Sequence, residues 1–272
     1  MNMKNDVQKS SYLGEVIAVS NQKGGCGKTT VTINLGVALS KLGYKVLCVD
    51  GDKQVNMTSG LIKRPETIEN KDLGVILQNI LDDKKFQVKK FITHTRYVDI
   101  IAGNRALYKY LKEFNERSDR NTVYRNILDG IRDAYDFILI DCPPTAGAEN
   151  VQAYTAATQI LIVSEPSLYS SDGVIDAIDI AQIAKKKTNK DLKLLGIVIN
   201  KMNFGWSDHK EYEADIRQSY QKYVRVFDTV IPCRACVAKA TTNAKSVMQH
   251  RSKDKASIAF KKLALEVVKG VL

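Results

Sequence analysis

The sequence has no uninterrupted apolar run of the roughly 18 residues that a membrane-spanning helix needs. Its first residues, MNMKNDVQKSSYLG, also lack the apolar core of a secretory signal peptide. These two absences predict a soluble, cytoplasmic protein.

Cysteine and histidine are both scarce. The five cysteines are odd in number and show no spacing typical of a disulfide framework, which favours a reducing compartment. The three histidines, His94, His209 and His250, are too scattered to indicate a metal site. The chain also has no internal repeat and no low-complexity linker. We therefore expect a flexible N-terminal tail over residues 1–14 and a single domain over residues 15–272.

Acidic residues are scarce in one part of the chain only. Residues 185–272 hold 19 Lys and Arg against 8 Asp and Glu, whereas residues 1–184 hold 22 of each class. The net charge of +11 therefore resides in the C-terminal third. Such asymmetry favours a polyanionic partner, either nucleic acid or an anionic membrane, over a merely solvated lysine-rich surface.

Short apolar runs rich in β-branched residues alternate with segments of helical periodicity. The apolar runs lie at residues 15–20, 45–50, 98–103, 136–141, 159–164, 194–200 and 226–231. The helical segments lie at residues 29–42, 122–134, 173–187, 208–222 and 257–271. This alternation predicts an α/β fold, a mostly parallel twisted sheet with helices on both faces. Ligands of such sheets bind at the carboxyl ends of the strands.

The stretch SNQKGGCGKTT, residues 20–30, joins the first apolar run to the first helical segment. It matches the phosphate-binding pattern G-x-x-x-x-G-K-[ST], except that Gln22 replaces the first glycine. Lys28 is placed to reach the β- and γ-phosphates, and the Thr29 hydroxyl to ligate Mg²⁺. The glycines that leave room for backbone N–H groups to surround a phosphate are Gly24, Gly25 and Gly27. A P-loop NTPase is therefore the expected fold.

Carboxylates end two of the predicted strands. Asp141 closes the run DFILID, where a Walker-B aspartate would hold Mg²⁺ through water. Asp50 and Asp52 flank Gly51 after the second run. Asp52 is the better placed of the two to orient an attacking water, whereas Asp50 is equally compatible with a plain turn.

The stretches KGGCGKTT, VDGDKQVN, YDFILIDCPP, VINKM and VFDTVIP together resemble the ParA/MinD family of deviant Walker-A ATPases, and most of all its short, Soj-type ParA partition proteins. The similarity covers nearly the whole chain from residue 15. It gives a role to Lys23, five residues before Lys28. Lys23 matches the signature lysine, which in the family crosses the interface of an ATP-bound dimer and touches the partner's nucleotide phosphates.

The resemblance also implies the remaining site residues and the cofactors, ATP and Mg²⁺. The implied catalytic residues are Lys23, Lys28 and Asp52. Thr29 would bind Mg²⁺ directly, and Asp141 would bind it through water. Asn56 matches the asparagine of the family's DPQGN element, and Asn200 and the Pro232 loop would frame the adenine. The implied ATP-binding residues are Lys23, Gly24, Gly25, Cys26, Gly27, Lys28, Thr29, Thr30, Asn56, Asn200 and Pro232.

By the same resemblance, the protein forms a homodimer on MgATP, binds DNA non-specifically and is reset by hydrolysis. This cycle would segregate a plasmid, chromosome or mobile element, with nucleoid association and a ParB-like centromere-binding protein as partner. The short form lacks the helix-turn-helix domain of longer relatives, so operator binding is not expected.

The sequence departs from the family at two places. DPQGN reads Asp52-Lys53-Gln54-Val55-Asn56 here, which loses the proline and the glycine of that loop. Two arginines that follow the family's Ile-Pro align with Cys233 and Cys236. The DNA contacts are therefore expected by charge alone, at Arg217, Lys222, Arg234, Lys245, Arg251 and Lys253. Further basic candidates are Lys185, Lys186, Lys187 and Lys255.

Two alternatives remain open at this point. Mrp-type iron–sulfur carrier ATPases place a C-x-x-C pair near their dimer interface, as Cys233 and Cys236 would, although two incidental cysteines explain the pair as well. A MinD-like positioning ATPase would use an amphipathic helix over residues 257–271 to bind a membrane. The same pattern also fits a helix packed against the sheet, which we favour, so no membrane is expected among the partners.

Overall fold

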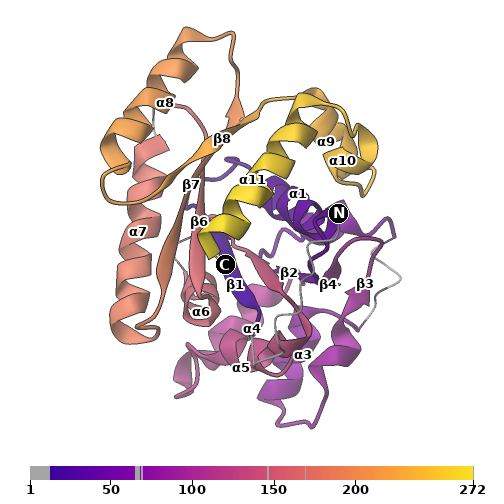
Figure 1. Ribbon diagram of the computed structural model, residues 1–272. Helices are drawn as coiled ribbons and strands as arrows, with labels where there is room; N and C mark the ends of the chain where they lie inside the picture. The colour runs from indigo at the N-terminus through magenta and orange to yellow at the C-terminus, as the bar shows by residue number, and fades with distance from the viewer. Residues whose placement is uncertain (1–12, 65–67, 69, 146, 169, 272) are drawn as a thin grey trace.

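The computed structural model describes residues 13–64, 68, 70–145, 147–168 and 170–271. At its centre lies an eight-stranded sheet in the order β3-β4-β2-β5-β1-β6-β7-β8 (Figure 1). The strands are β1 (Glu15–Ser20), β2 (Val46–Asp50), β3 (Thr93–His94), β4 (Asp99–Ile101), β5 (Phe137–Asp141), β6 (Gln159–Ser164), β7 (Lys193–Met202) and β8 (Val226–Pro232). Neighbouring strands run parallel, apart from β3, which is antiparallel to β4.

Helices cover both faces of this sheet. They are α1 (Lys28–Lys41), α2 (Asn56–Leu61), α3 (Leu73–Leu81), α4 (Leu107–Glu113), α5 (Val123–Asp129), α6 (Ala148–Ala156), α7 (Ser170–Lys187), α8 (Ser207–Tyr220), α9 (Ala235–Thr242), α10 (Val247–His250) and α11 (Lys255–Val271). Short 3₁₀ turns lie at η2 (Val88–Phe91), η3 (Phe114–Glu116) and η4 (Arg132–Ala134). The predicted α/β class is therefore confirmed.

Side-chain alternation in the central strand explains the two cores. Val16 and Ala18 of β1 belong to one buried cluster, with residues of α3 to α7. Ile17 and Val19 point to the other face and join a cluster with α1, α10 and α11. Both faces of a parallel strand are buried, so β1 reads as an almost continuous apolar run.

Some predicted elements differ from the structure. The helix expected over residues 122–134 ends at Asp129, because Gly130 interrupts it before η4. The edge strand β3 was not predicted, since only two residues form it and it leads into a hairpin closed by Thr95 and Val98. Helices of four to nine residues, such as α10 and α3, also left too few periodic positions to be recognised.

The C-terminal helix α11 packs against the molecule. It crosses α1 and lies beside β8 (Figure 1). Ala256, Phe260, Leu263 and Val267 are fully buried along one side of it. Packing thus accounts for most of the apolar pattern of residues 257–271, whereas Ile258 and Leu265 stay exposed. None of the helices that the structure describes has the length and apolar character needed to cross a membrane.

Most of the predicted N-terminal tail, residues 1–12, lies outside the described residues. The described chain is bonded to the fold from Gly14, whose N–H donates to the Arg132 carbonyl at 3.2 Å. Glu15 follows as the first residue of β1, and its N–H donates to the Asp136 carbonyl at 2.9 Å.

Candidate functional site

The loop between β1 and α1 has the backbone that a phosphate-binding turn needs. Gly25 and Gly27 adopt φ angles of 80° and 95°, in the left-handed region that favours glycine. Gly27 is also the residue that precedes α1, and a Cβ there would lie 2.3 Å from Asn200 Nδ2. The first N–H groups of α1 therefore remain available at a helix N-terminus, where an anion is stabilised.

Side chains from β7 fix this loop from the opposite side. Asn200 Nδ2 donates to the Cys26 carbonyl at 2.8 Å, and Lys201 Nζ donates to the Gly25 carbonyl. Asn200 is buried, so its amide acts as a fixed part of the loop's wall. Pro232 ends β8 in register with Met202 of β7. The expected contacts of Asn200 and Pro232 with adenine stay a prediction.

The two lysines of the loop point to different partners. Lys28 is buried and its Nζ donates to the Lys23 carbonyl at 3.1 Å, so it folds back over the loop. Lys23 Nζ instead donates to Ser167 Oγ at 2.7 Å and pairs with Glu165 Oε1 at 3.1 Å. Glu165 also pairs with Lys201 at 3.7 Å. Lys23 and Lys28 are therefore not equivalent in this structure.

Sequence reasoning missed Glu165, Ser167 and Lys201. Glu165 and Ser167 follow β6, and Lys201 lies near the end of β7, at the same edge of the sheet as the loop. The carboxyl ends of parallel strands meet at one edge of the sheet. The charged residues Glu165 and Lys201, near the ends of β6 and β7, could therefore have been predicted to lie close to the loop.

Asp141 and Asp50 end adjacent strands and are aligned in the parallel register of β5 and β2. Both are fully buried. Burial, with the nearby Asp50 charge, raises the pKa of Asp141 well above its ordinary value, although a hydrogen bond from Thr29 opposes this. Burial raises the pKa of Asp50 to about 6 against the opposing hydrogen bonds from Thr58.

The residues around Asp141 suit a hard cation. Asp141 Oδ1 accepts from Thr32 Oγ1 at 3.4 Å, while its Oδ2 is buried and finds no hydrogen-bond partner among the described residues. Thr29, which is close enough to hydrogen-bond to Asp141, adds a hydroxyl oxygen. Carboxylate, hydroxyl and water oxygens are the ligands that Mg²⁺ uses, so the expected Mg²⁺ residues fit the ion.

Asp52 lies on the loop that connects β2 to α2. Its side chain is 6% exposed, and its Oδ1 accepts the Gln54 N–H at 2.9 Å. Val55 adopts φ 58° and ψ 28°, a left-handed conformation at the position where the family has glycine. Asn56 begins α2 and is exposed. The loop thus keeps its left-handed residue although the glycine is lost.

The residues expected to bind DNA do not form one surface. Arg234, Lys245, Arg251 and Lys253 are exposed around α9, α10 and the start of α11, beyond the carboxyl end of β8. Lys222 lies in the turn before β8, at the other end of that strand.

Arg217 is engaged within the fold. Its Nε donates to Glu213 Oε1 at 3.0 Å and its Nη2 to the Phe227 carbonyl at 3.2 Å. The first bond lies within α8, and the second attaches α8 to β8. The six residues expected to bind DNA thus lie towards two ends of β8, and DNA binding by any of them stays a prediction.

The C-x-x-C pair lies at the start of α9. Cys233 is exposed and Cys236 is partly buried. Burial and the nearby Asp254 carboxylate raise the pKa of the Cys236 thiol, which disfavours the thiolate that a metal or cluster would need.

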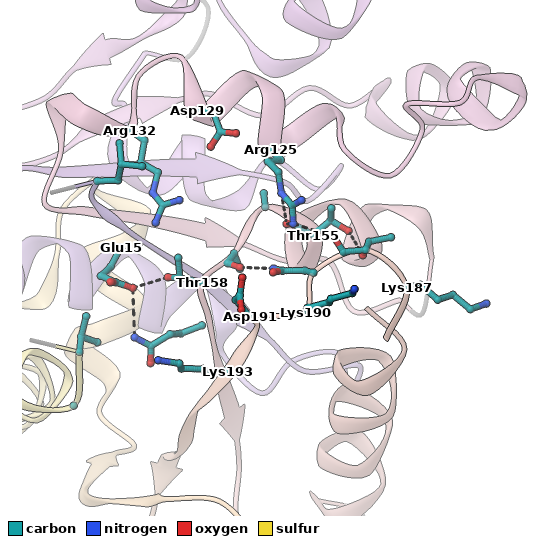
Figure 2. A pocket seen from close by; sticks show the side chains of 18 residues that line it. Glu15, Arg125, Asp129, Arg132, Thr155, Thr158, Lys187, Lys190, Asp191 and Lys193 are labelled. Atoms are coloured by element: carbon teal, nitrogen blue, oxygen red, sulfur yellow. Dashed lines mark hydrogen bonds between the residues drawn. The ribbon is translucent and has the colours of Figure 1, made fainter. Parts of the chain in front are cut away.

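A hollow of about 930 Å³ lies at the opposite edge of the sheet, where β1, β6 and β7 begin (Figure 2). Arg125 Nε donates to the Thr155 carbonyl at 2.9 Å and its Nη2 to the Thr188 carbonyl at 3.1 Å. Glu15 Oε2 accepts from Thr158 Oγ1 at 2.6 Å. Arg125 thus joins α5 to α6 and to the residue after α7, and Thr158 joins β1 to the connection between α6 and β6. None of these groups belongs to the phosphate-binding edge.

Known proteins resemble this chain along almost its whole length. An AAA-domain family matches residues 14–194. The sporulation initiation inhibitor protein Soj of Bacillus subtilis is 29% identical, with 94% of this chain and 98% of Soj covered. The chromosome partitioning protein ParA of Caulobacter vibrioides is 30% identical, with 93% of each chain covered.

Solved structures agree with these relatives. The septum site-determining protein MinD of Pyrococcus horikoshii, complexed with Mg-ADP, is 27% identical and superposes with a TM-score of 0.72, over 94% of this chain and 97% of MinD. Soj, ParA and MinD are thus similar to this chain in sequence, and MinD also in fold. With the glycine-rich loop, Lys23 and Lys28 in place between β1 and α1, the chain belongs to the ParA/MinD family of P-loop ATPases.

Proposed function

We propose that this protein is a ParA-type partition ATPase, which dimerises on MgATP, binds DNA non-specifically and is released when ATP is hydrolysed. The observation that carries the proposal is the divergence of the two loop lysines. Lys28 covers its own loop, whereas the Lys23 ammonium is held 2.7 Å from Ser167, away from that loop's interior. A lysine placed outside its own phosphate site is suited to reach the phosphates of a second subunit.

MgATP would bind at the carboxyl edge of the sheet. The loop glycines and the α1 N-terminus would surround the phosphates, and Lys28 would neutralise part of their charge. Thr29 and, through water, Asp141 would hold Mg²⁺, which when bound shields the β- and γ-phosphate oxygens. Asp52 would orient the attacking water from the loop after β2. The Pyrococcus horikoshii MinD structure, which is complexed with Mg-ADP, supports a magnesium-bound adenine nucleotide as the ligand.

DNA binding is assigned to Arg234, Lys245, Arg251 and Lys253. This group lies at the same edge of the sheet as the phosphate-binding loop. Asn34 of α1 connects the two regions, because its Nδ2 donates to the Thr30 carbonyl at 2.8 Å and its Oδ1 accepts the Val247 N–H of α10 at 2.8 Å.

We further propose a cytoplasmic, nucleoid-associated protein that acts with a ParB-like centromere-binding partner. The relatives named as chromosome partitioning proteins support this cellular role. The buried apolar side of α11 disfavours a MinD-like role in which that helix enters a membrane.

The proposal is tested by measuring binding to unrelated DNA duplexes and to anionic lipid vesicles, each with ATP, with ADP and without nucleotide. We expect DNA binding that requires ATP and differs little between duplexes, because phosphate contacts carry no sequence information. Vesicle binding with ATP and no DNA binding would replace the partition role with a membrane-positioning role.

A further inference from the structure

We propose that Asp50 and Thr58 act as positioning residues that hold the Asp52 loop in place for hydrolysis. This inference rests on the proposed ATPase function and adds a role for two residues outside the phosphate-binding loop. Thr58 donates two hydrogen bonds to Asp50 Oδ2, and these two bonds together are called the Asp50–Thr58 contact.

The contact closes the segment that carries Asp52. The Thr58 N–H donates to Asp50 Oδ2 at 2.8 Å, and the Thr58 hydroxyl donates to the same oxygen at 2.6 Å. Asp50 is the last residue of β2 and Thr58 lies within α2. Both residues are buried, at 0% and 1% exposure. The intervening residues are therefore anchored at both ends.

A third element joins the same contact. The Gly103 N–H, after β4, donates to the Thr58 hydroxyl oxygen at 2.9 Å. A Cβ on Gly103 would lie 2.8 Å from Asp50 Cγ, so this backbone approaches the carboxylate closely. The Thr58 hydroxyl thus donates to one strand end and accepts from the next, and both of its bonds are buried.

The anchored segment is held in an unfavourable conformation. Val55 is β-branched and has φ 58°, which L residues of this kind rarely adopt. Such a conformation persists where surrounding contacts over-determine it. Within the segment, the Val55 N–H donates to the Asp52 carbonyl at 2.9 Å and the Gln54 N–H to the Asp52 carboxylate at 2.9 Å. The Asp50–Thr58 contact keeps this turn closed and so fixes the Asp52 carboxylate.

A plain turn-forming role for Asp50 does not require Thr58. A turn-forming aspartate bonds to the backbone about two residues further on, as Asp52 does with Gln54. Asp50 accepts such a bond from the Asp52 backbone, but it also bonds eight residues ahead, to a hydroxyl that accepts from the backbone after β4. The geometry therefore serves to position the loop.

The first test compares Thr58→Val, which removes the hydroxyl, with Thr58→Ser, which retains it. We expect Thr58→Val to lower kcat for ATP hydrolysis roughly tenfold to a hundredfold, since a displacement near 1 Å has effects of this size. KM for ATP should change less than about twofold, because the phosphate-binding loop is untouched. Thr58→Ser should restore kcat. Thr242→Val serves as the matched control, because Thr242 is an exposed helical threonine of α9 whose hydroxyl donates to the Ala238 carbonyl in its own helix.

The second test does not depend on ATPase activity. Hydrogen exchange of the Gln54 and Val55 amides, measured without nucleotide, should be faster in Thr58→Val than in the parent and Thr58→Ser. If the parent protein did not hydrolyse ATP, the proposed function would be refuted. The amide exchange rates would still decide whether Thr58 positions the loop. An unchanged exchange rate, an unchanged kcat in an active protein, or failure of Thr58→Ser to restore either quantity would overturn the inference.

Discussion

Val55 shows how the site tolerates a departure from the loop sequence of its family. The position requires a left-handed backbone, with φ 58°, which glycine adopts without strain and valine does not. The sequence alone revealed that a glycine was missing. It did not reveal that the left-handed conformation survives. The supporting contacts join Asp50 to Thr58 and Thr58 to Gly103, and no local sequence pattern indicates that these three residues meet in the fold.

Replacing Val55 by glycine should stabilise the protein. Left-handed strain at a non-glycine residue costs about 1–3 kcal/mol, and the added flexibility of glycine in the unfolded chain offsets part of the gain. We expect a net gain of about 1 kcal/mol in the free energy of unfolding for Val55→Gly, measured by urea denaturation. Val55→Ala, which removes only the branched side chain, serves as the control and should gain less. A Val55→Gly protein less stable than the parent would contradict the strain assigned here.

The helices and strands that were predicted correctly are those that a short stretch of sequence identifies by itself. The buried strands β1, β5 and β6 appear in the sequence as continuous apolar runs. The glycine-rich motif between β1 and α1 is enough by itself to predict a phosphate-binding loop. Strand order is set by tertiary packing, so the contacts of Lys23 with Glu165 and Ser167 could not be predicted from local pattern. The same holds for the division of the basic residues between the two ends of β8.

Helix α11 is docked through a partly buried carboxylate as well as through its apolar side. Glu266 accepts hydrogen bonds from the Asp228 N–H at 3.0 Å, the Thr229 N–H at 2.9 Å and the Thr229 hydroxyl, and its carboxylate also pairs with Arg225 at 3.2 Å. Burial alone would raise the pKa of Glu266, but these bonds outweigh it and lower the pKa. The folded state therefore favours the ionised carboxylate.

Glu266→Ala should destabilise the fold by about 1.5–3 kcal/mol at pH 7, the range for hydrogen bonds to a charged group. A carboxylate with a lowered folded pKa stabilises above its unfolded pKa, and this contribution is lost as pH falls through the folded pKa. The difference between parent and variant should therefore shrink below pH ~4.5. Thermal unfolding over a pH series measures it, with Lys269→Ala, on the same helix, as the control. Equal stability of parent and Glu266→Ala at pH 7 would show that α11 is held by its apolar side alone.

Across the whole molecule, charge and fold together support the proposed DNA surface. The excess of basic residues after residue 184 predicted a polyanion partner, but only the structure separates the four residues near the nucleotide edge from Arg217 and Lys222. The four-residue group is the part that a nucleotide-dependent change in α1 could influence through Asn34 and Val247.

Reversing the charges of Lys245, Arg251 and Lys253 to glutamate should weaken DNA binding and reduce its salt dependence by about one in log–log slope per lost phosphate contact. ATP hydrolysis without DNA should stay at the parent level, because these residues lie outside the phosphate-binding loop. The matched control reverses Lys185, Lys186 and Lys187 at the far end of α7. Fluorescence anisotropy over a salt series with saturating ATP measures both proteins. If the variant at Lys245, Arg251 and Lys253 bound DNA as tightly as the parent, these residues would not belong to the DNA surface.

The most direct test of the account is the assembly state of Lys23→Ala, measured by sedimentation velocity with ATP and with ADP beside the parent and Lys28→Ala. We expect the parent to dimerise with ATP and not with ADP. Lys23→Ala should still bind ATP but remain monomeric, whereas Lys28→Ala should lose most of its nucleotide affinity. An ATP-bound dimer of Lys23→Ala as stable as that of the parent would contradict the claim that this lysine serves the second subunit.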